Sequence, residues 1–359
     1  MYSLIKNAKK SLKFFIKIMI LFSFLSSQDL EDLSFGDNYS LDIATWNIEW
    51  FPKNGQYTVD YLINIISLLD LDIIAIQEID DTTMFDQMLN LLPEYSGYYE
   101  SSWFAGLAYI YKTGIVEPNN IFEIYTTSSY WNAFPRSPMV MDMNFMGENY
   151  FIINNHFKCC GDGIIDFNDT SDEENRRYIA INLIKEYIDN NLANEKVIVL
   201  GDLNDDIAEA LPNNVFQDIL DDSENYSFAD LDIAQGNSSE WSFPNWPSHL
   251  DHILITNELF NGFNTFEVQT IKIDDYLDNG WYEYDQNISD HRPVAIKFAI
   301  DSIPNYDINN DGATDESDIA ILVEYIMNAN GSLYLSDFNT DTMVDIFDLY
   351  LLLDFIQDL

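Results

Sequence analysis

The amino-acid sequence predicts an α/β protein in which a large layered domain of strands and helices precedes a small all-α domain. Three observations support this prediction. Short apolar runs that end at polar residues alternate with segments of helical periodicity, which is typical of layered α/β folds. The chain has 359 residues, 47% of them hydrophobic, so it has room for two domains and a large core. Near its end, a pattern of acidic and apolar residues occurs twice.

Residues 1–28 have the composition of a secretory signal peptide. Lysines come first, the apolar run IMILFSFL follows, and the small residues Ser26 and Ser27 come next. A transmembrane anchor is the alternative, but the apolar run after Lys17 is short for a hydrocarbon layer of about 30 Å. We therefore expect an exported protein that is secreted or extracellular, with a second domain that could tether it at a cell surface.

The charge balance is strongly acidic. The formal net charge is −45, and five of the 16 basic residues precede Asp29, so the remainder carries 11 − 61 = −50. This excess of carboxylates argues against long-range attraction to a polyanion and suits divalent cations or a salty medium. The two cysteines, Cys159 and Cys160, are adjacent. Their position excludes a disulfide framework and leaves open a strained vicinal ring or two free thiols.

The apolar pattern predicts the elements of the large domain. Strands are expected at residues 42–46, 71–76, 107–111, 139–143, 150–154, 252–255 and 293–298, with one more at the start of 197–205. The strands at 107–111 and 139–143 are expected to pair. Helices are expected at 59–69, 80–92 and 173–191, and Ser171 with Glu174 forms a predicted capping box before the last of them.

Polar side chains follow the strands of this domain. The stretch 197–205, VIVLGDLND, has the pattern of a buried strand that stops at a glycine and presents Asp202 and Asn204 on one side. The other strand ends read TWNIEW, IQEID, NNHFK, SHLDHIL and SDHRP. A single such end is a common turn, but a series of them predicts a shared site at one edge of the sheets.

All four histidines of the chain fall within three of these motifs. The polar neighbours of His156 and His291 favour a functional site, whereas we interpret His249 and His252 as core residues. Phosphoester hydrolysis needs charge neutralised on the phosphoryl oxygens and groups that move protons. A hard cation held by carboxylate and amide oxygens meets the first need, and two histidines steadied by carboxylates meet the second. The sequence contains no Gly-rich phosphate loop, GxSxG elbow or HExxH motif, which would indicate other chemistries.

Taken in order, these motifs resemble those of the endonuclease/exonuclease/phosphatase superfamily, whose deoxyribonuclease-like members have a four-layer α/β sandwich with the site at the strand ends. The resemblance covers residues 40–300, the predicted catalytic domain. It implies that Asn47 and Glu78 bind a divalent metal ion, Mg²⁺ or Mn²⁺. It also implies that Asp290 shares this metal and orients His291, the candidate general base.

The same resemblance assigns the remaining site residues. Asp202 and Asn204 match the pair that holds the attacking water and the phosphate, so Asn204 is also a substrate-binding residue. His156 matches a second histidine, with Asp251 as its aspartate partner. Arg136 resembles an arginine that grips a substrate phosphate, and an ordinary loop cation is the alternative.

The chain departs from the deoxyribonuclease branch just before the strand at 107–111. Ser102, Trp103 and Phe104 stand where that branch has a Tyr and a Glu, so no acidic residue there supports His291. This difference weakens the prediction of a deoxyribonuclease-like substrate more than that of phosphoester hydrolysis. The role of Glu49, which lies where some members have an acid near the metal, is left open.

A linker at 301–305 precedes the small domain, predicted at 306–359. Its two loops have the spacing of oxygen donors in EF-hands, and each is followed by a helix with apolar residues at i, i+3, i+4 and i+7. This duplication resembles a type I dockerin domain, which binds two Ca²⁺ ions and docks onto a cohesin-bearing protein. The calcium ligands implied are Asp307, Asn309, Asp311, Asp315 and Asp318, then Asp337, Asn339, Asp341, Asp345 and Asp348.

Together these expectations describe a secreted, divalent-metal-dependent phosphoesterase that hydrolyses phosphodiester bonds and is tethered through a calcium-binding dockerin to a cohesin. A nuclease acting on nucleic acid is the favoured form. The alternatives are a phosphodiesterase or phosphatase acting on lipid or small phosphoesters, such as sphingomyelin or inositol phosphates, and a non-catalytic binding module. The acidic charge favours the smaller substrates, because DNA binding draws on Lys and Arg contacts.

Overall fold

The computed structural model describes residues 29–37, 40–100, 105–260, 266–299, 306–309, 313–328, 336–338 and 343–358. The expected signal peptide at 1–28 and the expected linker at 301–305 lie outside these residues. Within the described ranges, no helix combines the length and the hydrophobicity that crossing a membrane requires.

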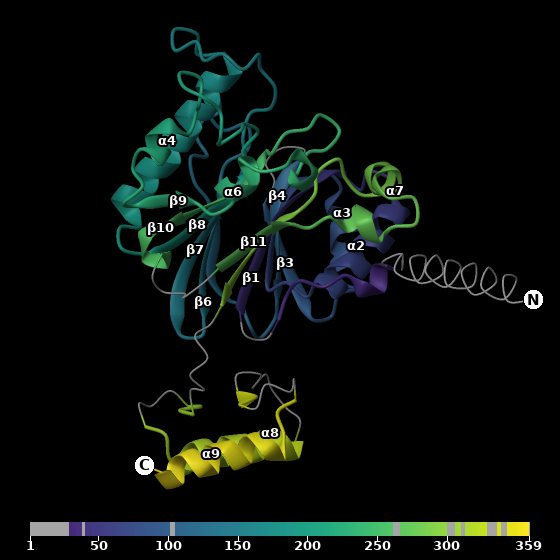
Figure 1. The fold of residues 1–359 in the computed structure, drawn as a ribbon, viewed down its shortest axis with the longest axis vertical. Coiled ribbons are helices and arrows are strands. Elements are labelled where there is room, and N and C mark those ends of the chain that lie inside the picture. The colour runs from purple at the N-terminus through teal and green to yellow at the C-terminus, as the bar shows by residue number, and fades with distance from the viewer. Residues whose placement is uncertain are drawn as a thin grey trace, which may run out of the picture.

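Two six-stranded mixed sheets form the centre of the large domain (Figure 1). The first sheet has the strand order β11-β12-β1-β2-β4-β3, and the second has the order β5-β6-β7-β8-β10-β9. The strands are β1 (Ser40–Phe51), β2 (Ile73–Ile79), β3 (Tyr95–Glu100), β4 (Gly106–Lys112), β5 (Glu117–Glu123), β6 (Met139–Phe145), β7 (Glu148–His156), β8 (Lys196–Asp202), β9 (Tyr226–Phe228), β10 (Asp251–Thr256), β11 (Phe266–Thr270) and β12 (Val294–Ala299).

Helices cover the outer faces of both sheets, as the sequence predicts for an α/β sandwich. Figure 1 shows α2, α3 and α7 beside the first sheet and α4 beside the second. The helices of this domain are α2 (Gln56–Leu69), α3 (Thr82–Leu89), α4 (Glu173–Asn191), α5 (Gln217–Leu220), α6 (Leu231–Ala234) and α7 (Trp281–Asn287), with short 3-10 turns η1 (Leu30–Asp32), η2 (Ser238–Glu240), η3 (Asn257–Leu259) and η4 (Ile273–Tyr276).

Three apolar clusters lie between these layers. Successive residues of a strand point to opposite faces of its sheet. In β1, Ile43 packs in the cluster between the two sheets, while Ala44 and Trp46 pack toward the helices. In β8, Leu200 packs between the sheets and Val199 packs toward α4. Burial on both faces explains why these strands read as nearly continuous apolar runs.

Asn154 of β7 links the two sheets beneath the strand ends. Its Nδ2 donates to the carbonyl oxygens of Ile76 and Ala108 in the first sheet, at 3.0 Å each. Its Oδ1 accepts from Gln77 Nε2 at 2.8 Å, and its backbone N–H donates to the Tyr109 hydroxyl at 3.0 Å. All these groups are buried, so the network stabilises one relative placement of the sheets.

The expected pairing of the strands at 107–111 and 139–143 is wrong. β4 pairs with β2 and β3 in the first sheet, whereas β6 pairs with β5 and β7 in the second. The two strands instead contribute to the apolar cluster between the sheets, where the Tyr109 hydroxyl lies 2.8 Å from the carbonyl oxygen of Met139. A buried apolar run identifies a strand without identifying its hydrogen-bonded neighbour.

Helix α4 has the predicted bounds but a different cap. Asp172 is the N-cap residue, and its side chain accepts from Asn175 N at 2.7 Å. Glu174, expected to form a capping box with Ser171, instead accepts from Gly163 N at 2.6 Å. Asp caps a helix as well as Ser does, so a cap one residue later leaves the helix in place.

The loop between β7 and α4 carries both cysteines. Cys159 and Cys160 are free and exposed, with their sulfur atoms 3.1 Å apart. Arg177 of α4 holds this loop, because its Nη1 donates to the carbonyl oxygens of Lys158 and Cys160. The Arg177 Nε donates to Asp205 Oδ2 at 2.7 Å, so the same side chain also fixes the loop that follows β8.

The described parts of 306–359 contain two helices, α8 (Glu316–Asn328) and α9 (Ile346–Asp358). Leu322 and Leu352 occupy equivalent positions of the sequence repeat, 30 residues apart. Both are fully buried and form one apolar cluster with Phe338. The repeated apolar positions therefore serve to pack one helix against the other.

Each loop before these helices closes on the carboxylate at its end. Asp318 accepts from Ile308 N at 2.7 Å through Oδ1 and from Asp315 N at 2.9 Å through Oδ2. Asp348 makes the two equivalent bonds 30 positions later, at 2.6 and 2.8 Å. The described parts of the two loops thus make the same closing hydrogen bonds. Three of the implied calcium ligands lie outside the described residues: Asp311, Asn339 and Asp341.

Candidate active site

Three neighbouring strands of the second sheet place polar residues in one row. The register of β7, β8 and β10 aligns His156 with Asp202, and Asp202 with Asp251. Each of these residues is at most 3% exposed. Because paired residues on adjacent strands point to the same face, one histidine and two carboxylates lie side by side.

Gly201 explains the compactness of this row. Its φ is +143°, and a Cβ at this position would lie 2.0 Å from the carbonyl oxygen of Asn155 on β7. Only glycine lets the two backbones approach so closely. The glycine that ends the apolar run therefore sets the spacing between His156 and Asp202.

Asn47 and Glu78 come from β1 and β2 of the first sheet. The ladder between these strands is regular as far as the pair Asn47–Gln77 and then shifts its register. Glu78 has a φ of +68°, and Glu49 and Trp50 also have positive φ. A bulge of this kind turns side chains out of the ladder. Here it lets Asn47 Nδ2 donate to Glu78 Oε1 at 3.2 Å.

The Asn47 amide also joins the two sheets. Its Nδ2 donates to Asp202 Oδ2 at 2.9 Å. His156 Nε2 lies 3.5 Å from the same carboxylate atom and 3.8 Å from Glu78 Oε1. Residues that are far apart in the sequence therefore meet in one buried group. We call the group of Asn47, Glu78, His156 and Asp202, together with His291, the catalytic cluster.

His291 reaches this cluster from the segment before β12. Ser289 fixes the segment, because its hydroxyl donates to Asn47 O at 2.6 Å and accepts from His291 N at 2.9 Å. His291 Nε2 lies 3.8 Å from Asp202 Oδ2. The Phe243 ring packs against the imidazole, with centroids 4.8 Å apart. The ring of His291 is thus held with Nε2 facing the carboxylates.

The carboxylate that orients His291 belongs to Asp251, not to Asp290 as expected. His291 Nδ1 lies 2.7 Å from Asp251 Oδ2, whereas Asp290 Oδ1 lies 3.9 Å from Nε2. The expected pairing of Asp251 with His156 is therefore also wrong. Since β8 lies between β7 and β10, Asp202 separates the two residues. His156 Nδ1 has no hydrogen-bond partner among the described residues.

The Asp202 carboxylate is buried close to two other acids, Asp251 and Glu78. Burial disfavours its charged form, and the Asp251 and Glu78 carboxylates add repulsion, so its pKa rises to about 7. The His291 ring and the Asn47 amide act in the opposite direction. A cation bound among these carboxylates would relieve the repulsion.

The pKa values of the two site histidines shift in opposite directions. Burial alone would lower the pKa of His291, but the Asp251 and Asp202 carboxylates outweigh it and raise this pKa to about 10. Burial lowers the pKa of His156 well below its usual range, and the charges of Arg136 and His291 act in the same direction. The same cluster therefore favours the neutral form of His156 and the charged form of His291.

The donor set of the catalytic cluster fits a hard divalent cation. The carboxylates of Glu78 and Asp202 both lie within hydrogen-bond distance of the Asn47 amide. Asp290 adds a carboxylate at the partly exposed side of the cluster. Mg²⁺ and Mn²⁺ prefer such oxygen donors. Asn47 Oδ1 accepts from Glu49 N at 3.0 Å, so it would face a cation only after rotation of the amide.

Asn204 and Arg136 border the cluster. Asn204 has a φ of +57°, its N–H donates to Asp202 Oδ1 at 3.1 Å, and its Nδ2 donates to Phe157 O at 3.3 Å. Arg136 Nε donates to Ala105 O at 3.1 Å. Arg136 is close enough to His156 for its charge to help lower the pKa of that ring.

Glu49, whose role the sequence leaves open, orders the loop beside the metal-binding candidates. Its Oε2 accepts from Asp290 N at 2.8 Å, and it forms an ion pair with Lys53. Sequence reasoning misses Ser289 and Phe243. Ser289 opens the SDHRP motif and could have been found there, but no motif marks Phe243. The departures at 102–104 lie outside the described residues.

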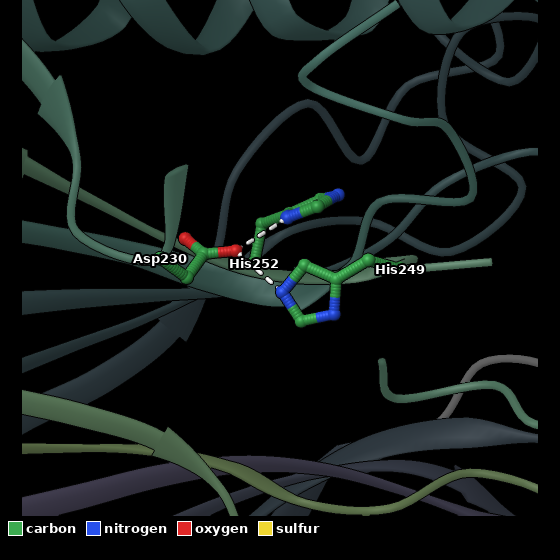
Figure 2. A group of neighbouring side chains, drawn as sticks. All are labelled: Asp230, His249 and His252. Atoms are coloured by element: carbon green, nitrogen blue, oxygen red, sulfur yellow. Dashed lines mark hydrogen bonds and ion pairs between the residues drawn. The ribbon is translucent and has the colours of Figure 1, made fainter. Parts of the chain in front are cut away.

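His249 and His252, interpreted from the sequence as core residues, are buried beside a carboxylate that the sequence does not single out. Figure 2 shows both rings directed at one oxygen of Asp230. His249 Nε2 lies 3.0 Å from this oxygen and His252 Nδ1 lies 2.6 Å from it. This second group is distinct from the catalytic cluster.

Comparison with known proteins supports the fold. A sequence profile of the Endonuclease/Exonuclease/phosphatase family matches residues 44–291. No curated protein matches the sequence. D. rerio TDP2 in complex with single-strand DNA product is 14% identical, with a TM-score of 0.55 over 72% of this chain and 98% of that one. The human Nocturnin catalytic domain with bound sulfate is 17% identical, with a TM-score of 0.53 over 72% and 94%.

A third similar structure is an endonuclease/exonuclease/phosphatase from Bacteroides vulgatus, which is 17% identical with a TM-score of 0.50 over 73% of this chain and 99% of that one. At these identities the likeness concerns the fold alone. The profile match covers more than half of the chain and includes the catalytic cluster from Asn47 to His291. The chain therefore belongs to the Endonuclease/Exonuclease/phosphatase family, whose members are metal-dependent hydrolases acting on phosphoesters.

Proposed function

We propose that this protein hydrolyses phosphodiester bonds with the help of a divalent cation, Mg²⁺ or Mn²⁺. One observation carries the proposal: Asn47 brings Glu78 of one sheet and Asp202 of the other into a single buried cluster with two histidines. A binding module that had lost catalysis would have no need to bury such a set of acids and imidazoles.

Glu78, Asp290 and Asn47 would hold the cation. When bound there, the cation supplies positive charge to the phosphoryl oxygens. Charge of this kind is the main requirement of phosphoryl transfer, because the reaction builds negative charge on those oxygens. The remaining side chains have to place a water molecule and move protons.

Asp202 and Asn204 lie side by side at the end of β8 and would place the attacking water and the phosphate. His291 is oriented by Asp251 through Nδ1 and keeps Nε2 directed at the catalytic cluster. The charge of a bound cation would offset the carboxylates that raise the pKa of His291, and the ring could then take a proton and return it. His156, a neutral ring, would serve as a hydrogen-bond partner for a phosphoryl oxygen on the opposite side of Asp202.

We favour a nuclease because the catalytic domain has the fold of TDP2, which has been captured with a single-strand DNA product. One observation favours a smaller phosphoester. Among the described residues, nine of the eleven Lys and Arg side chains after position 28 form ion pairs with acids, and only Arg136 and Arg176 do not. Few cations are thus left for a long polyanion, so lipid or small phosphodiesters are the second candidate.

The tail is proposed to be a calcium-binding dockerin domain that tethers an exported enzyme to a cohesin-bearing protein. Two features support this: the two loops close on Asp318 and Asp348 in the same way, and α9 exposes large apolar side chains. Ile346, Phe347 and Tyr350 are each at least 60% exposed, although they lie in one helix of a small domain. Such a patch is typical of a protein-binding surface.

The proposal is tested with the protein freed of residues 1–28 and treated with EDTA. Plasmid DNA, single-stranded DNA, RNA, sphingomyelin and a chromogenic phosphodiester are each assayed without metal and with Mg²⁺, Mn²⁺ or Ca²⁺. We expect metal-dependent cleavage of at least one substrate, and loss of that cleavage in Glu78→Ala. Cleavage that needs no metal, or none of any substrate, would refute the proposal.

A further inference from the structure

Asp230, His249 and His252 form a second buried group, which has the composition of a zinc ligand set (Figure 2). The hydrogen bonds exclude that use. His249 Nδ1 accepts the backbone N–H of Ser242 at 3.3 Å, so the ring proton is on Nε2, which faces Asp230. A ring nitrogen that carries a proton has no lone pair for a metal ion.

The same reasoning assigns the charges in this group. His252 Nε2 lies 2.8 Å from the carbonyl oxygen of Asp205, which can only accept, so Nε2 carries a proton. Its Nδ1 lies 2.6 Å from Asp230 Oδ2. Asp230 Oδ1 accepts from Ile253 N at 3.0 Å, and Oδ2 accepts from His249 Nε2 at 3.0 Å. Hydrogen bonds from two N–H donors favour the carboxylate over the carboxyl form, so the proton shared with His252 belongs to its Nδ1. Asp230 is therefore a carboxylate and His252 an imidazolium.

The surroundings strengthen this ion pair. Both residues are fully buried, and the rings of Phe216 and Phe228 each form a T-shaped contact with the His252 ring, with centroids 5.9 Å apart. Burial opposes both charges, yet the charge of His252 holds the pKa of Asp230 below its usual range and the charge of Asp230 raises that of His252. Removing one partner of such a pair leaves the other charge buried without compensation.

The imidazolium holds the loop that follows β8. Among the described residues, His252 Nε2–H donates to the carbonyl oxygen of Asp205, the residue after Asn204. Arg177 Nε donates a hydrogen bond to the side chain of the same residue, Asp205. The left-handed backbone of Asn204 is thus fixed by two buried cations at the next residue.

The neutral ring, His249, holds the other half of the site through Ser242. The Ser242 hydroxyl accepts from Asp251 N at 3.2 Å, and the Ser242 carbonyl accepts from Arg292 N at 2.7 Å. Ser242 thus contacts the backbone of Asp251 and of the residue after His291. Asp251 and His291 are the two residues whose side chains form the Asp251–His291 hydrogen bond. A single carboxylate thereby connects three segments that meet only in the folded protein.

We propose that the group Asp230–His249–His252 is a positioning device for the catalytic cluster. It fixes the loop after β8, the start of β10 and the segment before β12, from which the acid–base and water-placing side chains project. The proposal rests on the proposed phosphodiesterase function. None of the three residues touches the catalytic cluster through a hydrogen bond of its own, so each acts only through the backbone and through Ser242.

The kinetic test compares Asp230→Asn with the wild-type protein on the best substrate. Loss of the carboxylate charge should lower kcat by about 10- to 100-fold, because small displacements of catalytic groups cost this much, while KM stays within about twofold. Val199→Ala, in the core beside α4, is the matched control that loses packing without touching the network. An equal loss of kcat in both variants, or none in Asp230→Asn, overturns the proposal.

Two further measurements keep the test independent of activity and of folding. Nitrogen-15 NMR of the histidine side chains should show two protected ring N–H groups on His252 and one on His249. The Nδ1–H signal of His291 should shift in the milder variant Ser242→Ala, which removes the hydroxyl acceptor alone. A His252 with one ring proton, an unmoved His291 signal, or stoichiometric zinc lost in His249→Ala would each overturn the proposal. If no phosphodiester is cleaved, the proposed function is refuted, and the NMR signals alone test the positioning role.

Discussion

The Asp251 carboxylate of the second sheet is hydrogen-bonded across the sandwich to His291, which precedes a strand of the first sheet, with Oδ2 2.7 Å from Nδ1. This bond fixes both the tautomer and the direction of the imidazole. A reaction that moves a proton through Nε2 depends on it. The other oxygen of Asp251 is buried without a hydrogen-bond partner among the described residues, so this carboxylate serves His291.

We predict that Asp251→Asn lowers kcat by about 100-fold or more on any cleaved phosphodiester, since an amide cannot stabilise a charged imidazole. His291→Ala should cost at least as much, and the double variant should cost no more than His291→Ala alone. Steady-state kinetics measures all three. Asp232→Asn, at an exposed position of α6, is the control. Additive losses in the double variant would show that the two residues act separately.

Glu78→Ala is expected to abolish metal-dependent hydrolysis without unfolding the domain. The Glu78 side chain is less exposed than that of Asp290, the other acid proposed to hold the cation, and its removal takes away a proposed cation ligand rather than core packing. Calorimetric titration with Mn²⁺ should show weaker binding, and the melting temperature without metal should stay equal to or above that of wild type, because one repulsive charge is lost. Full activity of this variant would refute the metal assignment.

Stability should depend on pH through two acids far from the cluster, at the beginnings of β1 and β2. Burial raises the pKa of Asp72 to about 7 and that of Asp42 to about 6. A carboxyl group with a raised folded pKa binds protons more tightly when folded, so its contribution to stability falls as pH rises from about 4 to 7. Asp72→Asn should therefore stabilise the protein at pH 8, by on the order of 2 kcal/mol.

Urea denaturation at pH 5 and pH 8 measures this effect. At pH 5 the wild-type carboxyl is mostly protonated in the folded state, so the variant should gain little. Asp60→Asn, at an exposed position of α2, should behave alike at both pH values. The same gain for Asp72→Asn at both would show that its charge is not the cause.

Removal of calcium is expected to unfold the tail while leaving the large domain folded. Adding EGTA to the full chain should reduce the helical circular dichroism signal, and excess Ca²⁺ should restore it, because folding of such loops is coupled to binding. Asp318→Ala should lose the response of the first loop, since Asp318 closes that loop. Glu324→Gln, on the exposed side of α8, should respond as wild type does. A signal indifferent to EGTA would argue against calcium binding.

Much of the fold could be predicted because central strands are apolar on both faces, as β1, β2 and β8 are. The four strands that the sequence pattern does not predict, β3, β5, β9 and β11, are the four edge strands of the two sheets. Edge strands are paired on one side only, and β5 shows the result, since none of its residues is fully buried. Their sequence lacks the signal that identifies the central strands.

The sequence also predicted the residues of the candidate site better than it predicted their partners. The residues of the catalytic cluster could be predicted because each stands at the end of an apolar run. The partners could not, since the choice of Asp251 for His291 depends on which strands are neighbours and on the stacking of one sheet over the other. Asp230 lies in no motif, and only the fold brings it to the two histidines.

The amide of Asn154, wedged between the sheets, has a mechanical consequence. The catalytic cluster combines side chains from both sheets. If one sheet slid along the other by a fraction of a residue, the distances between these side chains would change. Because Asn154 donates to two carbonyls and accepts from Gln77 across that boundary, such a slip would break several interior bonds at once. The groups on the two sheets are therefore held in position before substrate binds. Thermal loss of activity should coincide with loss of the packing between the sheets.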